Sequence, residues 1–349
     1  MIVIGIDAHK RSHTMVAIDG SGKTLGQKTI PSISDGHTEA LRWALKQYGS
    51  ELLWAVEDSR VYTRLLEHDL MAARQHVVRV PTVLMAHCRK SARAAGKSDP
   101  IDAAAVARAV LREPNLPVAH HDDVTWDLKL LLDRREDLVH QRVATTNRLL
   151  MRLHLIDPAA PKPTRLHSPT GRGALLDSLQ DYQGLCVTLA QEELNDIDHF
   201  SQNIDALTKD IGRRVVGLGS TLTEIVGCGE LTAAKFICGA ANLDRFPSES
   251  AFARYVGVAP VPEWSGATRG RLRLSRAGNR ALNSALHTIA VTQIRLDCPG
   301  RTYYQRRIDE GDTKAGARRC LKRKICRVVF RRLVADYRRR GAIELARSG

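Results

Sequence analysis

Two carboxylates lie three residues apart around a proline in the stretch GKSDPIDA, residues 96–103. In one interpretation Asp99 caps a helix, Pro100 is its first residue, and Asp102 is an acid that favours the helix dipole. In the other, both side chains bind one divalent cation, because residues three apart on a helix share a face. The local sequence permits both interpretations.

Two further acids end predicted strands. Asp7 ends the apolar run IVIGID, and Glu57 ends LLWAVE, with Asp58 beside it as an alternative. Sites in α/β sheets tend to lie where the carboxyl ends of strands meet, and four acids gathered there would repel one another unless cations neutralised them. Two-metal phosphodiester chemistry needs this arrangement, with one ion activating the nucleophile and the other stabilising the leaving oxygen. Mg²⁺, or Mn²⁺ in its place, suits hard carboxylate oxygens.

The elements that must position these acids follow from the periodicity of the first third of the chain. Short β-rich runs and helical segments succeed one another in the order β-β-β-α-β-α-β-α, and Gly20–Gly22 marks a hairpin turn between the second and third strands. This order predicts an α/β domain with a mixed sheet.

The rest of the chain is predicted to be mainly helical. Long helices are expected over 125–155 and 181–216, separated by the proline-rich stretch DPAAPKPT. In the second helix, apolar residues step by three and four, as in a coiled-coil seam: Ile197, Phe200, Ile204, Leu207 and Ile211. An ordinary packed helix explains two heptads equally well, and the pair could form an antiparallel hairpin or a dimer contact. We therefore expect three domains: 1–115, a long-helix linker over 116–216, and 217–349.

The charge balance indicates a polyanionic partner. The 349 residues include 53 Lys and Arg against 38 Asp and Glu, a net charge of +15. Residues 301–349 alone hold 16 basic and 5 acidic residues. A solvated basic tail is the alternative, but so dense an excess favours a nucleic-acid surface.

The sequence also predicts a cytoplasmic protein. No apolar run approaches the length needed to span a bilayer, and the N-terminal charges follow the apolar stretch, the reverse of a signal peptide. The seven cysteines are scattered without a CxxC pair, so reduced thiols are expected and a zinc site is not.

The acid-bearing motifs resemble those of a known family. The order of a hairpin with Asp, a strand with Glu and Asp-x-x-Asp on a helix resembles the Holliday-junction resolvase (RuvC-like) version of the ribonuclease H fold. More specifically, GIDAHK, AVEDS and GKSDPIDAAAVARAV resemble the N-terminal DEDD domain of insertion-sequence transposases related to the Piv-type DNA invertases, the bridge-RNA-guided recombinases. Residues 222–286 are similar to that family's second domain, so the resemblance covers nearly the whole chain.

The resemblance implies a set of site residues. Asp7, Glu57, Asp99 and Asp102 would be the metal-binding acids. Ser265 in EWSGATRG would be the nucleophile, although Trp264 departs from the small polar residue that often precedes the family's serine. Ser275 is the alternative nucleophile, and without the family context Ser265 would be interpreted as a loop serine that satisfies a turn.

Basic residues around this serine are expected to contact the DNA backbone. Arginines can clamp phosphates, and a basic solvated strand is the alternative interpretation. Asn279 could bind or could cap a helix. The predicted nucleic-acid-binding residues are Lys10, Arg269, Arg271, Arg273, Arg276 and Asn279.

The resulting prediction is an enzyme, a DNA transposase of an insertion sequence that exchanges strands through a serine–DNA intermediate. The resemblance further implies a structured guide RNA, donor and target DNA, and a homo-oligomer that is a dimer at least and a tetramer on DNA. A metal-dependent junction resolvase or nuclease that uses water is the alternative enzyme. A non-catalytic nucleic-acid-binding protein with a decayed site is the alternative from another class, and the presence of all four acids argues against it.

Overall fold

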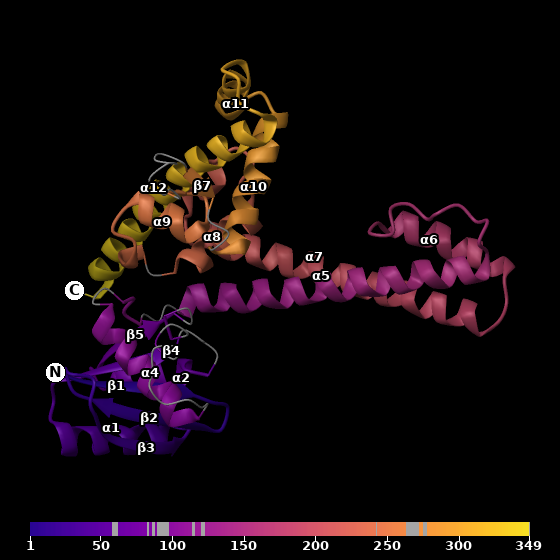
Figure 1. Ribbon diagram of the computed structural model, residues 1–349. Helices are drawn as coiled ribbons and strands as arrows, with labels where there is room; N and C mark the ends of the chain where they lie inside the picture. Colours follow the sequence, from indigo (N-terminus) through magenta and orange to yellow (C-terminus); the bar gives the residue numbers. More distant parts are fainter. Residues whose placement is uncertain are drawn as a thin grey trace, which may run out of the picture. The chain divides into compact units, whose positions relative to one another are not determined.

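The computed structural model describes residues 1–57, 62–81, 84–85, 88, 98–113, 116–119, 123–241, 243–262, 272–274 and 278–348. The chain forms two compact units, Met1–His121 and Asp122–Gly349 (Figure 1). Each unit is described by itself below.

A five-stranded mixed sheet forms the centre of the first unit. The strands stand in the order β3-β2-β1-β4-β5, with β1 antiparallel to β2 and parallel to β4. Their bounds are β1 Ile2–Ala8, β2 Ser12–Ile18, β3 Thr24–Pro31, β4 Leu52–Glu57 and β5 His76–Val80. This is the ribonuclease H-like topology, so the predicted fold class is confirmed. The element order also agrees with the sequence, because alternation, helical periodicity and turn glycines are local signals.

Helices cover the two faces of this sheet. Helices α1 (Ser34–Tyr48) and α2 (Arg64–Ala72) pack on one face, against buried residues such as Ile4, Ile6 and Trp54. Helix α4 (Asp99–Arg112) packs on the other face, against Val3, Leu53 and Ala55. Because side chains alternate along a strand, Gly5, Asp7 and Glu57 lie on the α4 face.

Gly5 allows α4 to approach the central strand closely. A Cβ atom at this position would lie 2.1 Å from the carbonyl oxygen of Ala103 and 2.5 Å from the backbone nitrogen of Ala107. Backbone atoms cannot move aside as the end of a flexible side chain can. The small residues of both elements therefore fix the distance between β1 and α4.

We expect Gly5→Ala to destabilise the first unit, because the added methyl group must displace α4. Such overpacking typically costs about 1–3 kcal/mol. Thermal unfolding followed by circular dichroism measures the change. The matched control is Gly20→Ala in the β2–β3 turn, where a Cβ meets nothing within 4 Å. That control should stay within about 0.5 kcal/mol of the wild type. Equal stability of Gly5→Ala and Gly20→Ala would contradict this account of the packing.

Two long helices begin the second unit. Helix α5 (Asp123–Ile156) and helix α7 (Leu185–Gly217) run antiparallel, side by side (Figure 1). Contacts mark their register: Arg135 Nε donates to Thr208 Oγ1, and Arg142 Nη1 donates to Ser201 Oγ. Helix α6 (Pro169–Ser178) packs on α7. Of the two arrangements predicted for the long helices, the structure contains the antiparallel hairpin within one chain, and the dimer contact stays a prediction.

The other end of this hairpin joins a helical core. Leu128 of α5 and Ile211 and Val215 of α7 pack into one cluster with the helices that follow. These elements are η2 Thr221–Glu224, α8 Glu230–Ala240, η3 Leu243–Arg245, α9 Glu249–Val256, α10 Arg280–Arg295, α11 Pro299–Asp309 and α12 Lys314–Ser348, with the short strands β6 Pro260–Pro262 and β7 Leu272–Leu274. The mainly helical character predicted for this part of the chain is thus confirmed, whereas the division into three domains stays a prediction. Among the described residues, no helix is both long and apolar enough to span a membrane.

Candidate metal and nucleic-acid sites

The predicted acids converge at one edge of the sheet. Ile6 of β1 pairs with Val56 of β4, so the next residues, Asp7 and Glu57, lie at the carboxyl ends of neighbouring parallel strands, on the face that α4 covers. Helix α4 begins at Asp99, which lies in its first turn together with Asp102. The tertiary structure therefore brings Asp7 close to Asp99 and Asp102, and the strand register places Glu57 on the strand beside Asp7.

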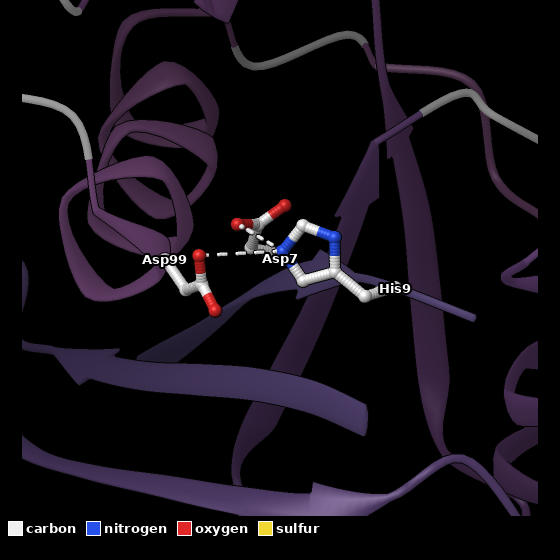
Figure 2. Close-up of side chains that lie close together, drawn as sticks. All are labelled: Asp7, His9 and Asp99. Carbon is white, nitrogen blue, oxygen red and sulfur yellow. Dashed lines mark hydrogen bonds and ion pairs between the residues drawn. The ribbon is translucent and has the colours of Figure 1, made fainter. Parts of the chain in front are cut away.

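His9 links the two groups of acids. Its Nε2 atom lies 3.1 Å from Oδ2 of Asp7 and 3.4 Å from Oδ1 of Asp99 (Figure 2). In the tautomer with a proton on Nε2, the ring donates a hydrogen bond to Asp7 Oδ2. Asp7 is only 7% exposed, whereas His9 and Asp99 are open to solvent. One ring nitrogen thus lies between two carboxylates that are 92 positions apart in the sequence.

Asp99 does not cap its helix. The N-cap position is taken by Ser98, whose side chain makes no capping hydrogen bond, and Asp99 is the first helical residue. The interpretation of Asp99 as the N-cap was wrong because the chain enters the helix one residue earlier. As a consequence the Asp99 carboxylate is directed to His9 rather than to the backbone of its own helix (Figure 2).

Electrostatics indicate that these acids are crowded. Burial raises the pKa of Asp7 above its ordinary value. His9 lowers this pKa, by its charge and its hydrogen bond, while the carboxylates of Asp102 and Asp99 raise it. Asp102 is itself 5% exposed. A buried carboxylate next to two others is unfavourable in the absence of a cation and favourable once a cation joins them.

The residues present fit a divalent metal. One ligand atom from each of Asp7, His9 and Asp99 lies within 4.8 Å of the other two. Hard carboxylate oxygens suit Mg²⁺ and Mn²⁺, and an imidazole nitrogen is more readily accepted by Mn²⁺ than by Mg²⁺. Sequence reasoning missed His9, although Asp-x-His at a strand end places both side chains on one face.

The second predicted site lies mostly outside the described residues. The described residues do not include Ser265, the predicted nucleophile, or its alternative Ser275. They also do not include Arg269, Arg271 and Arg276, nor Asp58, the alternative to Glu57 in the acidic cluster. The flanking strands are described: β6 and β7 are antiparallel, with Val261 opposite Arg273. Only the backbone of Arg273 is described. In the sequence, Ser265 lies between β6 and β7.

The two remaining predicted nucleic-acid residues are described. Lys10 is exposed and follows His9 directly at the end of β1. Asn279 caps α10, because its Oδ1 accepts a hydrogen bond from the Leu282 backbone N–H at 3.1 Å. Its Nδ2 donates to the Tyr255 hydroxyl, so the capping role left open by the sequence is the one observed. A contact of either residue with nucleic acid stays a prediction.

Comparison with protein families decides the affiliation of the chain. A DEDD-type transposase model named for IS110 matches residues 4–158, and the model of the IS116/IS110/IS902 transposase family matches residues 219–305. Both models describe transposases of one group, and together they match more than half of the chain. The chain belongs to the IS110/IS116 transposase family. The first match contains Asp7, His9, Glu57, Asp99 and Asp102, and the second contains the β6–β7 hairpin.

Relatives of the IS110/IS116 family resemble this chain along most of its length. The IS116 44.8 kDa protein of Streptomyces clavuligerus is 26% identical over 89% of this chain and 89% of its own. The IS900 42 kDa protein of Mycobacterium paratuberculosis is 24% identical over 93% of this chain and 94% of its own. Among solved structures, RuvC of T. thermophilus in complex with a Holliday junction substrate is similar, with 13% identity, a TM-score of 0.28, and coverage of 34% of this chain and 99% of that chain.

Proposed function

We propose that this transposase cuts and rejoins DNA strands of its insertion element through a serine–DNA covalent intermediate. The observation that carries the proposal is the convergence of Asp7, His9 and Asp99, beside the buried Asp102, at one edge of a ribonuclease H-like sheet in a transposase-family chain. A water-using resolvase or nuclease is not favoured, since both matched segments are those of transposases.

The acidic cluster would hold the divalent metal. Asp7, Glu57, Asp99 and Asp102 supply carboxylates, and His9 supplies a nitrogen beside two of them. Bound there, a divalent ion supplies charge stabilisation for the oxygens of the phosphodiester. The protein's own contribution is positional, because β1, β4 and α4 hold these groups in place.

Ser265 is the proposed nucleophile. Its hydroxyl oxygen would attack the phosphorus of one phosphodiester, forming a Ser265 Oγ–phosphorus bond while the bond to the leaving sugar oxygen breaks. The serine proton passes to a base, and the leaving oxygen gains a proton to become a hydroxyl. The bond count is unchanged, so a new strand hydroxyl can reverse the step and rejoin the DNA. The family resemblance and the arginines that follow in the sequence support this role.

We further propose a structured RNA as the guide, and a homo-oligomer as the active assembly. The net charge of +15 suits a polyanion, and an RNA that pairs with donor and target would leave the protein to contact backbone and shape. Joining two DNA partners requires at least two catalytic centres, which supports a dimer at minimum and a tetramer on DNA.

Strand exchange between two labelled duplexes that carry the donor and target junctions tests the proposed function. Protein with RNA transcribed from the non-coding end of the element should yield recombinant strands in Mg²⁺ or Mn²⁺, and no product in EDTA. Protein treated with ribonuclease should lose sequence-specific exchange and recover it when the RNA is restored. Exchange by RNA-free protein would refute the guide, and metal-dependent cleavage without rejoining would favour a nuclease.

A further inference from the structure

Four polar side chains line one edge of the contact between α10 and α12. The two helices share a core that includes Leu286 and Ile325. Asn283 and His287 lie one turn apart on α10, and Arg318 and Lys322 lie one turn apart on α12, so each pair shares a helix face. The pairs meet where the Lys322 ammonium donates a hydrogen bond to the Asn283 side-chain oxygen.

The basic residues of α12 differ in whether an acidic side chain pairs with them. Within the described part of the chain, neither Lys322 nor Arg318 forms an ion pair. Other arginines of α12 do, since Arg331 and Arg327 pair with Glu249 and Arg332 pairs with Glu224. Positive charge is therefore balanced along part of α12 and left unbalanced beside α10.

Burial and like charges act on the titratable groups of this cluster. Burial, and then the charge of Arg318, lowers the pKa of Lys322. Burial, followed by the charges of Lys322 and Arg318, lowers the pKa of His287, which keeps the ring neutral and able to donate one N–H at pH 7. Two crowded cations and a neutral donor make an arrangement that an anion would stabilise.

This group of side chains lies beside the two segments that lead into and out of the β6–β7 hairpin. The Asn283 side chain donates to the carbonyl oxygens of Val256 and Gly257, at 3.1 and 3.0 Å, where α9 ends and the chain turns towards β6. Gly278, which follows β7, comes so near that a Cβ on it would lie 2.7 Å from the Gly257 Cα. The chain thus enters and leaves the hairpin region beside Asn283, and with it beside Lys322.

We propose that Arg318, Lys322 and His287 bind one backbone phosphate of the nucleic-acid strand that reaches the β6–β7 hairpin. The assignment rests on the proposed function, and it adds a phosphate contact to it. Arg318 and Lys322 lie beyond residue 305, where the match to the second family model ends. The ligand is a phosphodiester in DNA or in RNA, and probes of both kinds distinguish the two sources.

Equilibrium binding of the full chain to a fluorescein-labelled DNA duplex and to a single-stranded RNA, over a series of salt concentrations, tests the proposal. Lys322→Met should raise the Kd about five- to tenfold at 0.1 M salt for the strand that occupies the site. It should also make the plot of log K against log salt shallower by about 0.7 to 0.9, the effect of one lost phosphate contact. Arg318→Gln should do the same, without removing a hydrogen bond that the structure shows. An effect on one probe alone identifies the strand as DNA or RNA.

Two control variants keep the result interpretable. Lys322→Arg keeps the charge and should retain most of the affinity. Lys209→Met removes a lysine from an exposed position of α7 and should change the Kd less than twofold and the slope hardly at all. Wild-type binding with unchanged Kd and slope in folded Lys322→Met and Arg318→Gln would overturn the phosphate site and leave the proposed function standing. A wild-type chain that binds neither probe would overturn both.

Discussion

A Ser265→Ala protein is expected to bind nucleic acid as the wild type does and to form no covalent protein–DNA product. One hydroxyl contributes little to an affinity dominated by backbone phosphates. The same hydroxyl is the only atom that could form the phosphoester if the proposed role is right. Removing an essential nucleophile should lower strand exchange by about 10⁴-fold or more.

The measurement is a denaturing gel with a labelled DNA duplex that carries a nick near the crossover, which prevents rejoining. Wild-type protein should give a slow, protease-sensitive band, and Ser265→Ala should give none. Ser275→Ala is the matched control, since it removes the alternative serine of the same region, and should keep the band. The reverse pattern would transfer the role to Ser275. Cleavage by all variants with no adduct would favour water as the nucleophile.

Neutralising the acidic cluster should have the second large effect. Asp7→Asn, Asp99→Asn and Asp102→Asn should each lower strand exchange by about 10³-fold or more, because each removes a carboxylate from the proposed metal site, which is expected to stabilise charge on the phosphodiester. His9→Gln should lower strand exchange less, because it removes no carboxylate. It should weaken Mn²⁺ binding more than Mg²⁺ binding, because Mn²⁺ accepts an imidazole nitrogen more readily.

Thermal unfolding separates metal binding from catalysis. In EDTA, Asp7→Asn should melt at a higher temperature than the wild type, because a buried carboxylate crowded by Asp99 and Asp102 is replaced by a neutral amide. With Mn²⁺ at a hundred times its Kd, the wild type should gain about 2.7 kcal/mol, and the variant should gain much less. Glu51→Gln is the control, since this exposed acid precedes β4 at the end opposite Glu57. Equal stabilisation of all these proteins by Mn²⁺ would contradict the assignment of the site.

Much of the fold could be predicted from the sequence because its signals are local. The five strands, the hairpin glycines and the two long helices each follow from periodicity and punctuation within a few residues. The acids could be placed at strand ends for the same reason. The family motifs then indicated which acids belong together, including Asp7 and Asp102, which are far apart in the sequence.

The α5–α7 pair shows what local sequence signals do not specify, namely the partner of a packing helix. The apolar seam through Ile197, Ile204 and Ile211 predicts a partner helix but does not specify which one. In the structure the partner is α5 of the same chain, and contacts such as Arg135 with Thr208 fix the register. A packing face contains no information on whether its complement lies in the same chain, so this choice had to come from the tertiary structure.

By itself the sequence determined the kinds of element, their order, and the acids and cations available to a transposase of this family. The tertiary structure decided which of these side chains meet. His9 reaches both Asp7 and Asp99 because Gly5 lets α4 approach β1 and because Ser98, not Asp99, precedes the helix. Lys322 meets Asn283 because α12 returns along α10. Contacts of this kind depend on the packing of helices and strands that are many residues apart in the sequence. The local periodicity of a sequence predicts each element but does not specify which distant element it packs against.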